Sequence, residues 1–255
     1  MIIRSLALKT ELGLAATRGT ITDRGDYVVI ETPDDPGYYF GNLLLLSAPP
    51  QVGEVAYWTR KFGEELGKNA AIRHVTLWWD TVTGDAGAED ELLAAGFRID
   101  RNLLLTAERV TAPAHAISQL SPEQVLDTED LGWATGDRHD ENYREFLKRR
   151  ARWQSSLVAR GLAKFFGVYD QGELVASLGI VPMGNVARYQ DVQTAVTHRR
   201  RGLAGALLAT AAREVPSSRY AIMAEPGGEA ERVYTRVGFR VAERPVSACR
   251  RPING

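Results

Sequence analysis

This sequence has almost no cysteine and no long apolar run. Cys249 is the single cysteine among 255 residues, so the chain can form no internal disulfide and carries no CxxC metal or redox motif. No uninterrupted apolar stretch approaches the roughly 18 to 20 residues that a membrane-spanning helix needs. Residues 1–16 are interrupted by Arg4, Lys9 and Glu11, so they lack the apolar segment of a signal peptide. These absences predict a cytoplasmic protein with no membrane partner.

The sequence also has few histidines and almost no net charge. The four histidines show no metal-ligand spacing such as HExxH, so we expect no metal. The net charge is −1. The pI of about 6.5 lies far below the value of about 9 that is typical of a nucleic-acid-binding domain, so we expect no nucleic-acid partner. The hydrophobic fraction of 44% is that of an ordinary globular protein, and composition leaves the oligomeric state open.

The length favours two domains, because 255 residues exceed the usual domain size of roughly 100 to 150. Residues 1–110 contain 11 Lys and Arg against 16 Asp and Glu, whereas residues 111–255 contain 20 against 16. The segment TAPAHA at 111–116 is small, neutral and proline-bearing, as a hinge is. We therefore expect domains at 1–110 and 111–255.

Hydrophobic periodicity and turn residues predict an α/β fold for both halves. In the first half, the expected strands are 26–32, 42–48, 74–80 and 102–110, and the expected helices are 54–68 and 89–97. In the second half, we expect a helix over 138–160, strands at 163–170, 173–181 and 186–194, a helix within 197–212, a strand at 219–225, a helix at 229–237 and a closing strand at 239–249. The segments ELLAAGFRID (91–100) and RVYTRVGFRVA (232–242) resemble each other, which suggests that the halves are related units.

The segment THRRRGLAGALLATAA (197–212) places three arginines directly before two glycines and an alanine- and leucine-rich helix. Gly202 and Gly205 allow a ligand to approach the backbone closely. The first N–H groups of the helix have no intrahelical acceptor and attract anions such as phosphate. One alternative is a solvated loop before an ordinary core helix. Another is a nucleic-acid patch, although three charges fall short of the roughly 6 to 10 phosphate contacts of a DNA binder.

The neighbouring residues favour a phosphorylated cofactor. RRRGLA (199–204) fits the R/Q-x-x-G-x-G/A signature of the GNAT superfamily of acyl-CoA-dependent N-acetyltransferases. AEPGGEAERVYTRVGF (224–239) resembles the second motif of that family, a strand end, a short helix with a tyrosine, and Gly-Phe. The resemblance covers 112–255 well and 1–110 only weakly. It implies two tandem GNAT-like domains, each a mixed, mostly antiparallel sheet flanked by helices, of which the first is degenerate and the second binds acetyl-CoA.

The resemblance also implies which residues bind the cofactor. In the family, backbone N–H groups of the glycine-rich loop wrap the pyrophosphate, and the preceding strand pairs with the pantetheine arm. The cofactor-binding residues expected here are Val192, Gln193, Thr194, Arg199, Arg200, Arg201, Gly202, Leu203, Ala204 and Gly205. Gly228 departs from the family, because an asparagine often contacts the cofactor at that position.

For catalysis, Tyr234 matches the family tyrosine that protonates the departing thiolate, and Leu92 stands at its place in the first half. The base is less clear. Relatives have glutamate where Gln193 stands, and an amide cannot take up a proton. Asp191 lies on the same strand face and could act through a water, although a structural role is equally open. An alkyl amine has a pKa of about 10.4, so deprotonation is a step that the site must provide or leave to solvent.

We therefore expect an N-acetyltransferase (EC 2.3.1.-) that transfers an acetyl group from acetyl-CoA to a small-molecule or peptide amine by direct attack. The alternative is a non-catalytic acyl-CoA-binding regulatory module, which Gln193 and Gly228 suggest. The basic stretch 147–152 favours a solvated helix face, and the aromatic residues at 38–40 and 78–79 favour core packing over a cleft. The acceptor and the length of the acyl group stay open.

Overall fold

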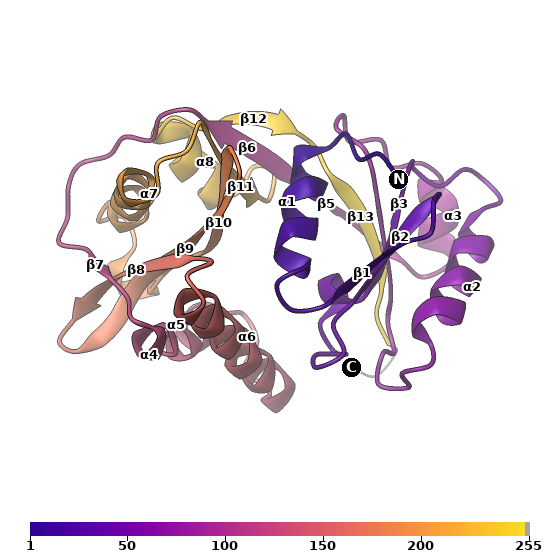
Figure 1. Cartoon of the computed structure of the whole chain (residues 1–255), viewed down its shortest axis with the longest axis horizontal. Helices are drawn as coiled ribbons and strands as arrows, with labels where there is room; N and C mark the ends of the chain where they lie inside the picture. The colour runs from indigo at the N-terminus through magenta and orange to yellow at the C-terminus, as the bar shows by residue number, and fades with distance from the viewer. Residues whose placement is uncertain (253–255) are drawn as a thin grey trace. The chain divides into compact units, whose positions relative to one another are not determined.

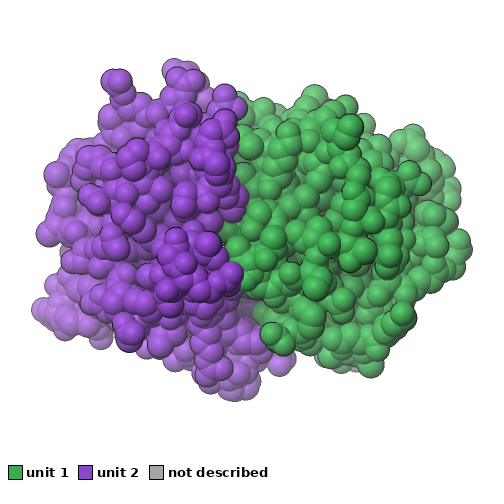
Figure 2. Space-filling model, viewed as in Figure 1, with its two compact units in different colours: residues 1–104, 241–255 green, residues 105–240 purple. Residues whose placement is uncertain are grey.

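The computed structural model describes residues 1–252, which form two compact units, each built on its own mixed sheet (Figure 1). Unit 1 combines residues 1–104 with the C-terminal segment from Val241, and unit 2 is residues 105–240 (Figure 2). This is the expected fold class, two α/β domains with helices flanking mixed sheets. Within residues 1–252, no helix has the length and apolar character to span a bilayer.

The six-stranded sheet of unit 1 has the order β1-β2-β3-β4-β13-β5. Its strands are β1 (Thr20–Asp23), β2 (Tyr27–Glu31), β3 (Leu43–Leu46), β4 (Val75–Trp79), β5 (Arg98–Arg101) and β13 (Val246–Arg250). The β3–β4 pair is parallel and the other neighbours are antiparallel. Leu44 lies opposite Leu77, and both are fully buried, as the central strands of a sheet covered on both faces should be.

The helical segments of unit 1 are α1 (Leu6–Ala15), η1 (Tyr39–Gly41), α2 (Val55–Leu66) and α3 (Glu89–Ala94). Figure 1 shows α2 and α3 on one face of the sheet and α1 on the other. Phe62 and Leu66 of α2 and Leu92 of α3 pack with Trp79 in one apolar core. Trp79 is fully buried, and its indole N–H donates to the Asp85 carbonyl at 2.8 Å, so core packing is its role.

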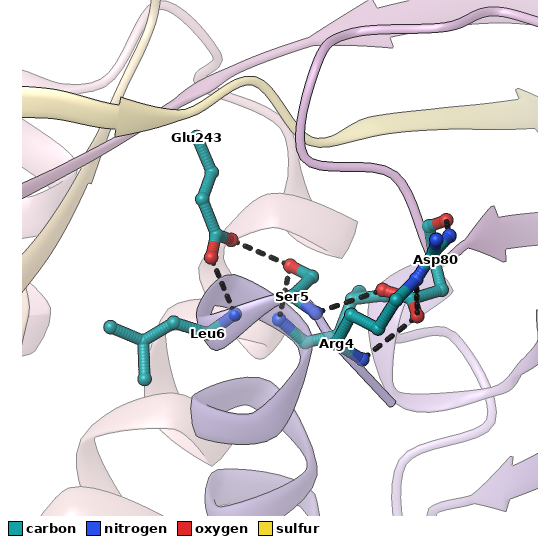
Figure 3. A network of polar contacts seen from close by, with 6 residues as sticks. Arg4, Ser5, Leu6, Asp80 and Glu243 are labelled. Atoms are coloured by element: carbon teal, nitrogen blue, oxygen red, sulfur yellow. Dashed lines mark hydrogen bonds and ion pairs between the residues drawn. The ribbon is translucent and has the colours of Figure 1, made fainter. Parts of the chain in front are cut away.

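Helix α1, which the sequence pattern did not indicate, is held at its N-terminus by two carboxylates (Figure 3). Glu243 accepts hydrogen bonds from the Ser5 hydroxyl at 2.7 Å and from the backbone N–H groups of Leu6 and Ala7 at 2.7 and 3.0 Å. The buried Asp80 accepts from the backbone N–H groups of Arg4 and Ser5 at 2.8 and 2.9 Å. The carboxylates satisfy N–H groups that have no acceptor within the helix.

The seven-stranded sheet, most of which belongs to unit 2, has the order β12-β6-β11-β10-β9-β8-β7. Its strands are β6 (Leu103–Ala107), β7 (Ser118–Gln119), β8 (Lys164–Asp170), β9 (Glu173–Met183), β10 (Val186–Thr194), β11 (Arg219–Ala224) and β12 (Arg240–Glu243). β7 to β10 form an antiparallel series, and β10 pairs with β11 in parallel. The parallel pair requires a crossover connection, which α7 supplies.

The helical segments of unit 2 are α4 (Pro122–Val125), α5 (Thr128–Thr135), α6 (Glu141–Ala159), η2 (Val196–His198), α7 (Leu203–Glu214) and α8 (Glu229–Arg236). α7 consists largely of alanine and leucine, which favour helix, and it buries Leu207 and Leu208 completely. Two buried tyrosines of the sheet also bind it: Tyr189 donates to the Leu208 carbonyl and Tyr220 to the Ala212 carbonyl, each at 2.8 Å. Helix α7 is therefore held at a fixed place on the sheet.

The compact units differ from the expected domain ranges. The expected closing strand 239–249 is divided between two sheets, because β12 belongs to the seven-stranded sheet whereas β13 lies between β4 and β5 in the six-stranded sheet. The break falls at Arg244 and Pro245, and proline has no N–H to give to a ladder. The expected hinge at 111–116 is not the unit boundary, which falls between Leu104 and Leu105.

The similar segments 91–100 and 232–242 each contain a helix that ends in the same way. In unit 1, the Phe97 N–H donates to the Leu92 carbonyl at 3.0 Å around Gly96, whose φ is +81°. In unit 2, the Phe239 N–H donates to the Tyr234 carbonyl at 3.1 Å around Gly238, whose φ is +117°. Both are helix ends closed by a glycine in the left-handed region. Leu92 and Tyr234 therefore occupy the same place in their two helices.

Candidate functional site

Unit 2 contains a cavity of about 760 Å³ at the ends of β10, α7 and α8. Residues 111–113, which precede β7 in the chain, also form part of its wall. The lining residues are Thr111, Ala112, Pro113, Thr135, Val192, Gln193, Thr194, His198, Arg199, Arg200, Gly202, Leu203, Ala204, Gly205, Glu229, Ala230, Arg232, Val233, Tyr234, Arg236 and Val237.

The cavity begins where two parallel strands separate. β10 pairs with β11 only over Val186–Arg188, although β10 continues to Thr194 and β11 to Ala224. Beyond Arg188, no strand of residues 1–252 pairs with the side of β10 that faces β11, and residues 192–194 line the cavity. A strand edge with unpaired N–H and C=O groups can bind an extended ligand through its backbone.

A β-bulge in β10 sets the direction of the next side chains. Gln190 lies opposite Gly179 and Gln193 opposite Ser177, so β10 has one more residue than β9 in this stretch. Asp191 sits in the bulge with a φ of +47°, a conformation that aspartate adopts more readily than most residues. Bulges occur frequently next to functional sites, where they redirect side chains.

The glycine-rich loop forms the cavity wall at the start of α7. Gly202 precedes the helix with a φ of +80°, and Arg200 has a φ of +63°, so the loop turns through two left-handed residues. The first α-helical bond runs from the Ala206 N–H to the Gly202 carbonyl, which leaves the preceding N–H groups without an acceptor inside the helix. The N-terminus of this 12-residue helix is thus a positive, donor-rich wall suited to an anion.

The three arginines of the loop point in different directions. Arg199 and Arg200 line the cavity, and the Arg199 Nε donates to the Thr194 carbonyl at 3.4 Å. Arg201 lies outside the lining, and its guanidinium donates to the Thr197 carbonyl at 3.0 Å. Arg201 therefore stabilises the turn before the helix, whereas the other two carry charge to the cavity.

Tyr234 of α8 lines the cavity and is only 6% exposed. Burial raises the pKa of its phenol to about 12, while the charge of Arg188 lowers the pKa and that of Asp191 raises it. The phenol is therefore fully protonated at neutral pH and can donate a proton.

Asp191 lies outside the cavity lining, and both of its carboxylate oxygens have partners on α6. The Arg150 guanidinium lies 3.2 Å from Oδ1, and the Gln154 side-chain amide donates to Oδ2. Arg150 belongs to the basic stretch 147–152, for which we expected a solvated face; instead its side chain is 17% exposed and pairs with β10. Arg150 and Gln154 were not predicted, because nothing in the sequence relates α6 to a bulge more than thirty residues further along.

Gln193 lines the cavity, and its side-chain oxygen is unusual. The Oε1 atom is buried and has no hydrogen-bond partner within residues 1–252. A Cβ placed on Gly132 of α5 would lie 3.7 Å from this oxygen and 2.8 Å from an Arg150 guanidinium nitrogen. Gly132 therefore allows α5 to approach β10 closely at the point where Gln193 faces the cavity.

The structure brings together most of the residues that we predicted for the site. Tyr234, residues 192–194, Arg199, Arg200 and residues 202–205 all line the cavity, whereas Asp191 and Arg201 do not. The segment 111–113, expected to be part of a hinge, forms wall instead, because small residues fit against the helix: a Cβ on Gly205 would lie 3.5 Å from the Ala112 Cβ. Glu229, Arg232 and Arg236 of α8 also line the cavity, and nothing in the sequence beyond the family motif indicated them.

Neither a metal-binding group nor the single cysteine adds a further site within residues 1–252. Across residues 1–252, no group of three or more His, Cys, Asp and Glu side chains is arranged to hold a metal ion. Cys249 is buried in β13, and its sulfur accepts from the Thr76 hydroxyl at 3.4 Å. Burial raises the pKa of this thiol, so it is a packed core residue and not a nucleophile.

Comparison with known proteins agrees with this geometry. The sequence model of the family described as "Acetyltransferase (GNAT) domain" matches residues 117–249, more than half of the chain. The chain therefore belongs to the GNAT acetyltransferase family. Members of this family generally use acetyl-CoA, and membership supports an acyltransferase. No curated protein matches the sequence.

Solved structures with the same fold extend over both units. A functionally unknown conserved protein from Staphylococcus epidermidis ATCC 12228 has a TM-score of 0.77 at 13% identity, over 92% of this chain and 95% of that one. A GCN5-related N-acetyltransferase from Kribbella flavida has a TM-score of 0.68 at 17% identity, over 97% and 96%. A tandem GNAT protein from the clavulanic acid biosynthesis pathway has a TM-score of 0.53 at 17% identity, over 81% and 72%. At these identities the similarity shows the fold, which is a tandem GNAT arrangement.

Proposed function

We propose that this protein is an N-acetyltransferase that transfers the acetyl group of acetyl-CoA to an amine by direct attack, with Tyr234 as general acid. One observation carries the proposal. A single cavity of unit 2 brings together the donor-rich start of α7, the unpaired side of β10 and the phenol of Tyr234. In unit 1, the corresponding helix position is the buried Leu92, so the chemistry is assigned to unit 2 alone.

The residues present fit coenzyme A. Phosphate groups would be held by backbone N–H groups over residues 199–205, next to the guanidinium groups of Arg199 and Arg200. Gly202 leaves room at this wall, because the nearest atom to a Cβ placed there is the His115 Nε2 at 3.5 Å. The amide groups of the pantetheine arm would pair with the backbone of residues 192–194. Acetyl-CoA supplies an activated acyl carbon and a thiolate leaving group.

Tyr234 has the properties of a general acid for that leaving group. Its raised pKa, about 12, keeps the phenol protonated over the physiological range, so the proton is present when the thiolate departs. The remainder of catalysis would be positioning, because one cavity would hold both reactants.

A second candidate function is a non-catalytic acyl-CoA-binding regulatory module. It is favoured by the two residues that we considered for the general base. The carboxylate of Asp191 already accepts hydrogen bonds from Arg150 and Gln154, and the side chain of Gln193 is an amide. Both candidates bind the same ligand and differ only in turnover. For either candidate, we place the protein in the cytoplasm, with no metal and with neither nucleic acid nor membrane as partner.

Tyr234→Phe separates the two candidates. For an enzyme, the substitution lowers kcat roughly 10²-fold or more, because it removes the general acid. The dissociation constant for coenzyme A, measured by calorimetry, stays within about twofold, because the phenol is not part of the phosphate wall. Turnover is measured as free thiol released from acetyl-CoA in the presence of an amine library. Tyr57→Phe, at a 41% exposed tyrosine of α2, is the matched control and leaves both quantities unchanged.

Two results would contradict this proposal. Coenzyme A binding with no thiol release for any amine leaves the regulatory module as the function. No coenzyme A binding at all by folded protein removes both candidates.

A further inference from the structure

We propose that Asp191 is a positioning residue and not the general base. Together with Arg150 and Gln154 it forms a clamp between α6 and the bulge of β10, and this clamp sets the strand edge that receives the pantetheine arm. The inference rests on the proposed acetyltransferase function and assigns roles to three residues within it. Four observations support it, and they concern the backbone at the bulge, the partners of the carboxylate, the burial of the clamp and its place beside the cavity.

The first observation is the backbone at the bulge, which is in a conformation that needs support. Asp191 has a φ of +47°, in the left-handed region that few residues other than glycine, asparagine and aspartate adopt. The register of β10 on β9 shifts at this point, between Gln190 and Gln193. A left-handed residue inside a strand persists only where the surrounding contacts hold it.

The second observation is that both carboxylate oxygens of Asp191 have partners on one helix. The Arg150 guanidinium donates to Oδ1 at 3.2 Å, and the Gln154 side-chain amide donates to Oδ2. Arg150 and Gln154 are four residues apart, so their side chains lie on the same face of α6. Hydrogen bonds to an ionised carboxylate are strong and directional, so these two fix the carboxylate and, through it, the bulge.

The third observation is that the clamp is built into the interior of unit 2. Gln154 is completely buried, and its side-chain oxygen accepts from the Thr128 hydroxyl of α5 at 3.2 Å. The side chains of Arg150 and Asp191 are 17% and 24% exposed. A Cβ placed on Gly132 of α5 would lie 2.8 Å from an Arg150 guanidinium nitrogen. Two helices therefore pack around the contact to the bulge.

The fourth observation is the place of the clamp beside the cavity. Residues 192–194 directly follow Asp191 and line the cavity, whereas Asp191 does not. Burial raises the pKa of the Tyr234 phenol, and the charge of Asp191 raises it further, so the clamp lies within electrostatic range of the proposed general acid. Asp191 thus acts on the reaction through the strand and not by contact with a ligand.

The cavity lining contains other groups that can take up a proton. These are His198, whose Nε2 lies 2.8 Å from an Asp170 carboxylate oxygen, and Glu229, which begins α8 at an exposed position. Because these two side chains face the cavity and both oxygens of Asp191 are occupied, proton transfer does not require Asp191.

Two substitutions at position 191 distinguish a clamp from a base. Asp191→Asn is the conservative variant, because asparagine also adopts a positive φ and keeps an oxygen for Arg150. The Gln154 amide can rotate, so that its oxygen accepts from the new amide and its nitrogen donates to the Thr128 hydroxyl. Asp191→Gly also permits a positive φ, but it removes both contacts to α6.

The two variants are expected to differ. Asp191→Asn should keep kcat, measured as thiol release with an amine acceptor, and the coenzyme A dissociation constant within about threefold of wild type. Asp191→Gly should weaken coenzyme A binding about tenfold. It should also lower kcat about tenfold or more, because the thioester is no longer held at a fixed place. If Asp191 were the base, both variants would lose about 10²-fold in kcat with binding unchanged.

A ligand without the pantetheine arm supplies a readout that a general loss of stability would not produce. Adenosine 3′,5′-bisphosphate keeps phosphates for the loop at 199–205 and lacks the arm that residues 192–194 would bind. Asp191→Gly and Arg150→Met should each weaken coenzyme A about tenfold in calorimetry and leave the bisphosphate affinity within about twofold. The double variant should be no weaker than the single variants by more than about twofold, because the two residues act through one contact.

Gln171→Gly and Gln171→Asn are the matched controls. Gln171 also has a positive φ, +52°, but it lies in the exposed turn between β8 and β9. Neither substitution should change kcat, coenzyme A affinity or bisphosphate affinity. Circular dichroism and the urea midpoint establish that each variant is folded.

Three results would overturn the inference and leave the acetyltransferase proposal standing. In the first, Asp191→Asn loses as much kcat as Asp191→Gly at unchanged coenzyme A affinity, which makes Asp191 the base. In the second, Asp191→Gly matches the wild type, so the strand edge needs no clamp. In the third, coenzyme A and the bisphosphate weaken equally, which indicates a general loss of structure.

Failure of the proposed function has a different signature. If the wild-type protein binds coenzyme A but releases no thiol with any amine, the acetyltransferase proposal fails, and the two ligand affinities still decide whether the clamp exists. If the folded wild-type protein binds no coenzyme A, both proposals are wrong.

Discussion

At the scale of single residues, the site depends on groups whose protonation is decided by burial. Tyr234 is the clearest case, because water is largely excluded around its phenol and the neutral form is favoured. The two nearest charges, Arg188 and Asp191, act on its pKa in opposite directions and do not reverse the effect of burial. The family resemblance pointed to this tyrosine, whereas the charges around it come from β10, some forty residues earlier.

The raised pKa leads to a prediction about pH. With a folded-state pKa of about 12 and a reference value of 10, Tyr234 stays protonated in the folded enzyme while the unfolded chain begins to ionise above pH 10. Its contribution to stability is therefore complete below pH 10 and is lost as the pH rises through 12. We expect kcat with a neutral acceptor to show no basic limb between pH 7 and 10. A fall in kcat with an apparent pKa of 8 to 9, in protein whose circular dichroism is unchanged, would contradict the assignment.

At the scale of elements, the loop and helix at residues 199–214 connect backbone conformation to binding. Gly202 has a φ of +80° and ends the turn where the helix begins. A side chain at this position strains the backbone, and it also occupies the wall where the N–H groups point. Stability and affinity are both affected, and a matched substitution can separate them.

Gly202→Ala and Gly161→Ala form that matched pair. Both glycines have positive φ, +80° and +69°, and neither has an atom closer than 3.5 Å to the position of a new Cβ. Each substitution is expected to cost about 1 to 2 kcal/mol of unfolding free energy, measured by urea denaturation. Only Gly202→Ala should weaken coenzyme A binding in calorimetry, by about tenfold. Equal affinity in the two variants would show that the loop backbone does not contact the phosphates.

Helix α1 provides a prediction that is independent of the site. Glu243 accepts three hydrogen bonds from Ser5, Leu6 and Ala7, and an amide in its place would direct N–H groups at some of these donors (Figure 3). Glu243→Gln is expected to lower the unfolding free energy by about 1 to 3 kcal/mol. Glu108→Gln, at an exposed position, is the control and should change it by less than about 0.5 kcal/mol. An unchanged midpoint for Glu243→Gln would contradict the role of the network.

At the scale of the whole molecule, unit 1 is assembled from both ends of the chain. The sheet of unit 1 takes β13 from the C-terminal end of the chain, between β4 and β5. Ala248 of β13 is fully buried in the same core as Leu77 and Leu92. Pairing over so long a sequence separation closes a long loop, so the strand should join late in folding. Residues 1–104 therefore do not contain a complete sheet.

Truncation after Glu243 tests this topology. Without β13, β4 and β5 lose their shared neighbour, and the amides of both strands are expected to lose protection in hydrogen exchange. Truncation after Pro252, which keeps β13, is the control and should leave the protection unchanged. If β4 stayed protected in the shorter chain, β13 would not be a structural part of unit 1.

Some of this protein was determined by its sequence alone. Local pattern was sufficient for the strands 163–170, 173–181 and 186–194 and for the helix of the glycine-rich loop, because each depends on residues within about ten positions of one another. Only the tertiary structure decided the rest. It brings together residues that are distant in the chain: Arg150 with Asp191, Glu243 with the start of α1, and β13 with β4 and β5. It also leaves the Gln193 oxygen without a hydrogen-bond partner within residues 1–252. No local propensity encodes which distant groups meet when the core closes.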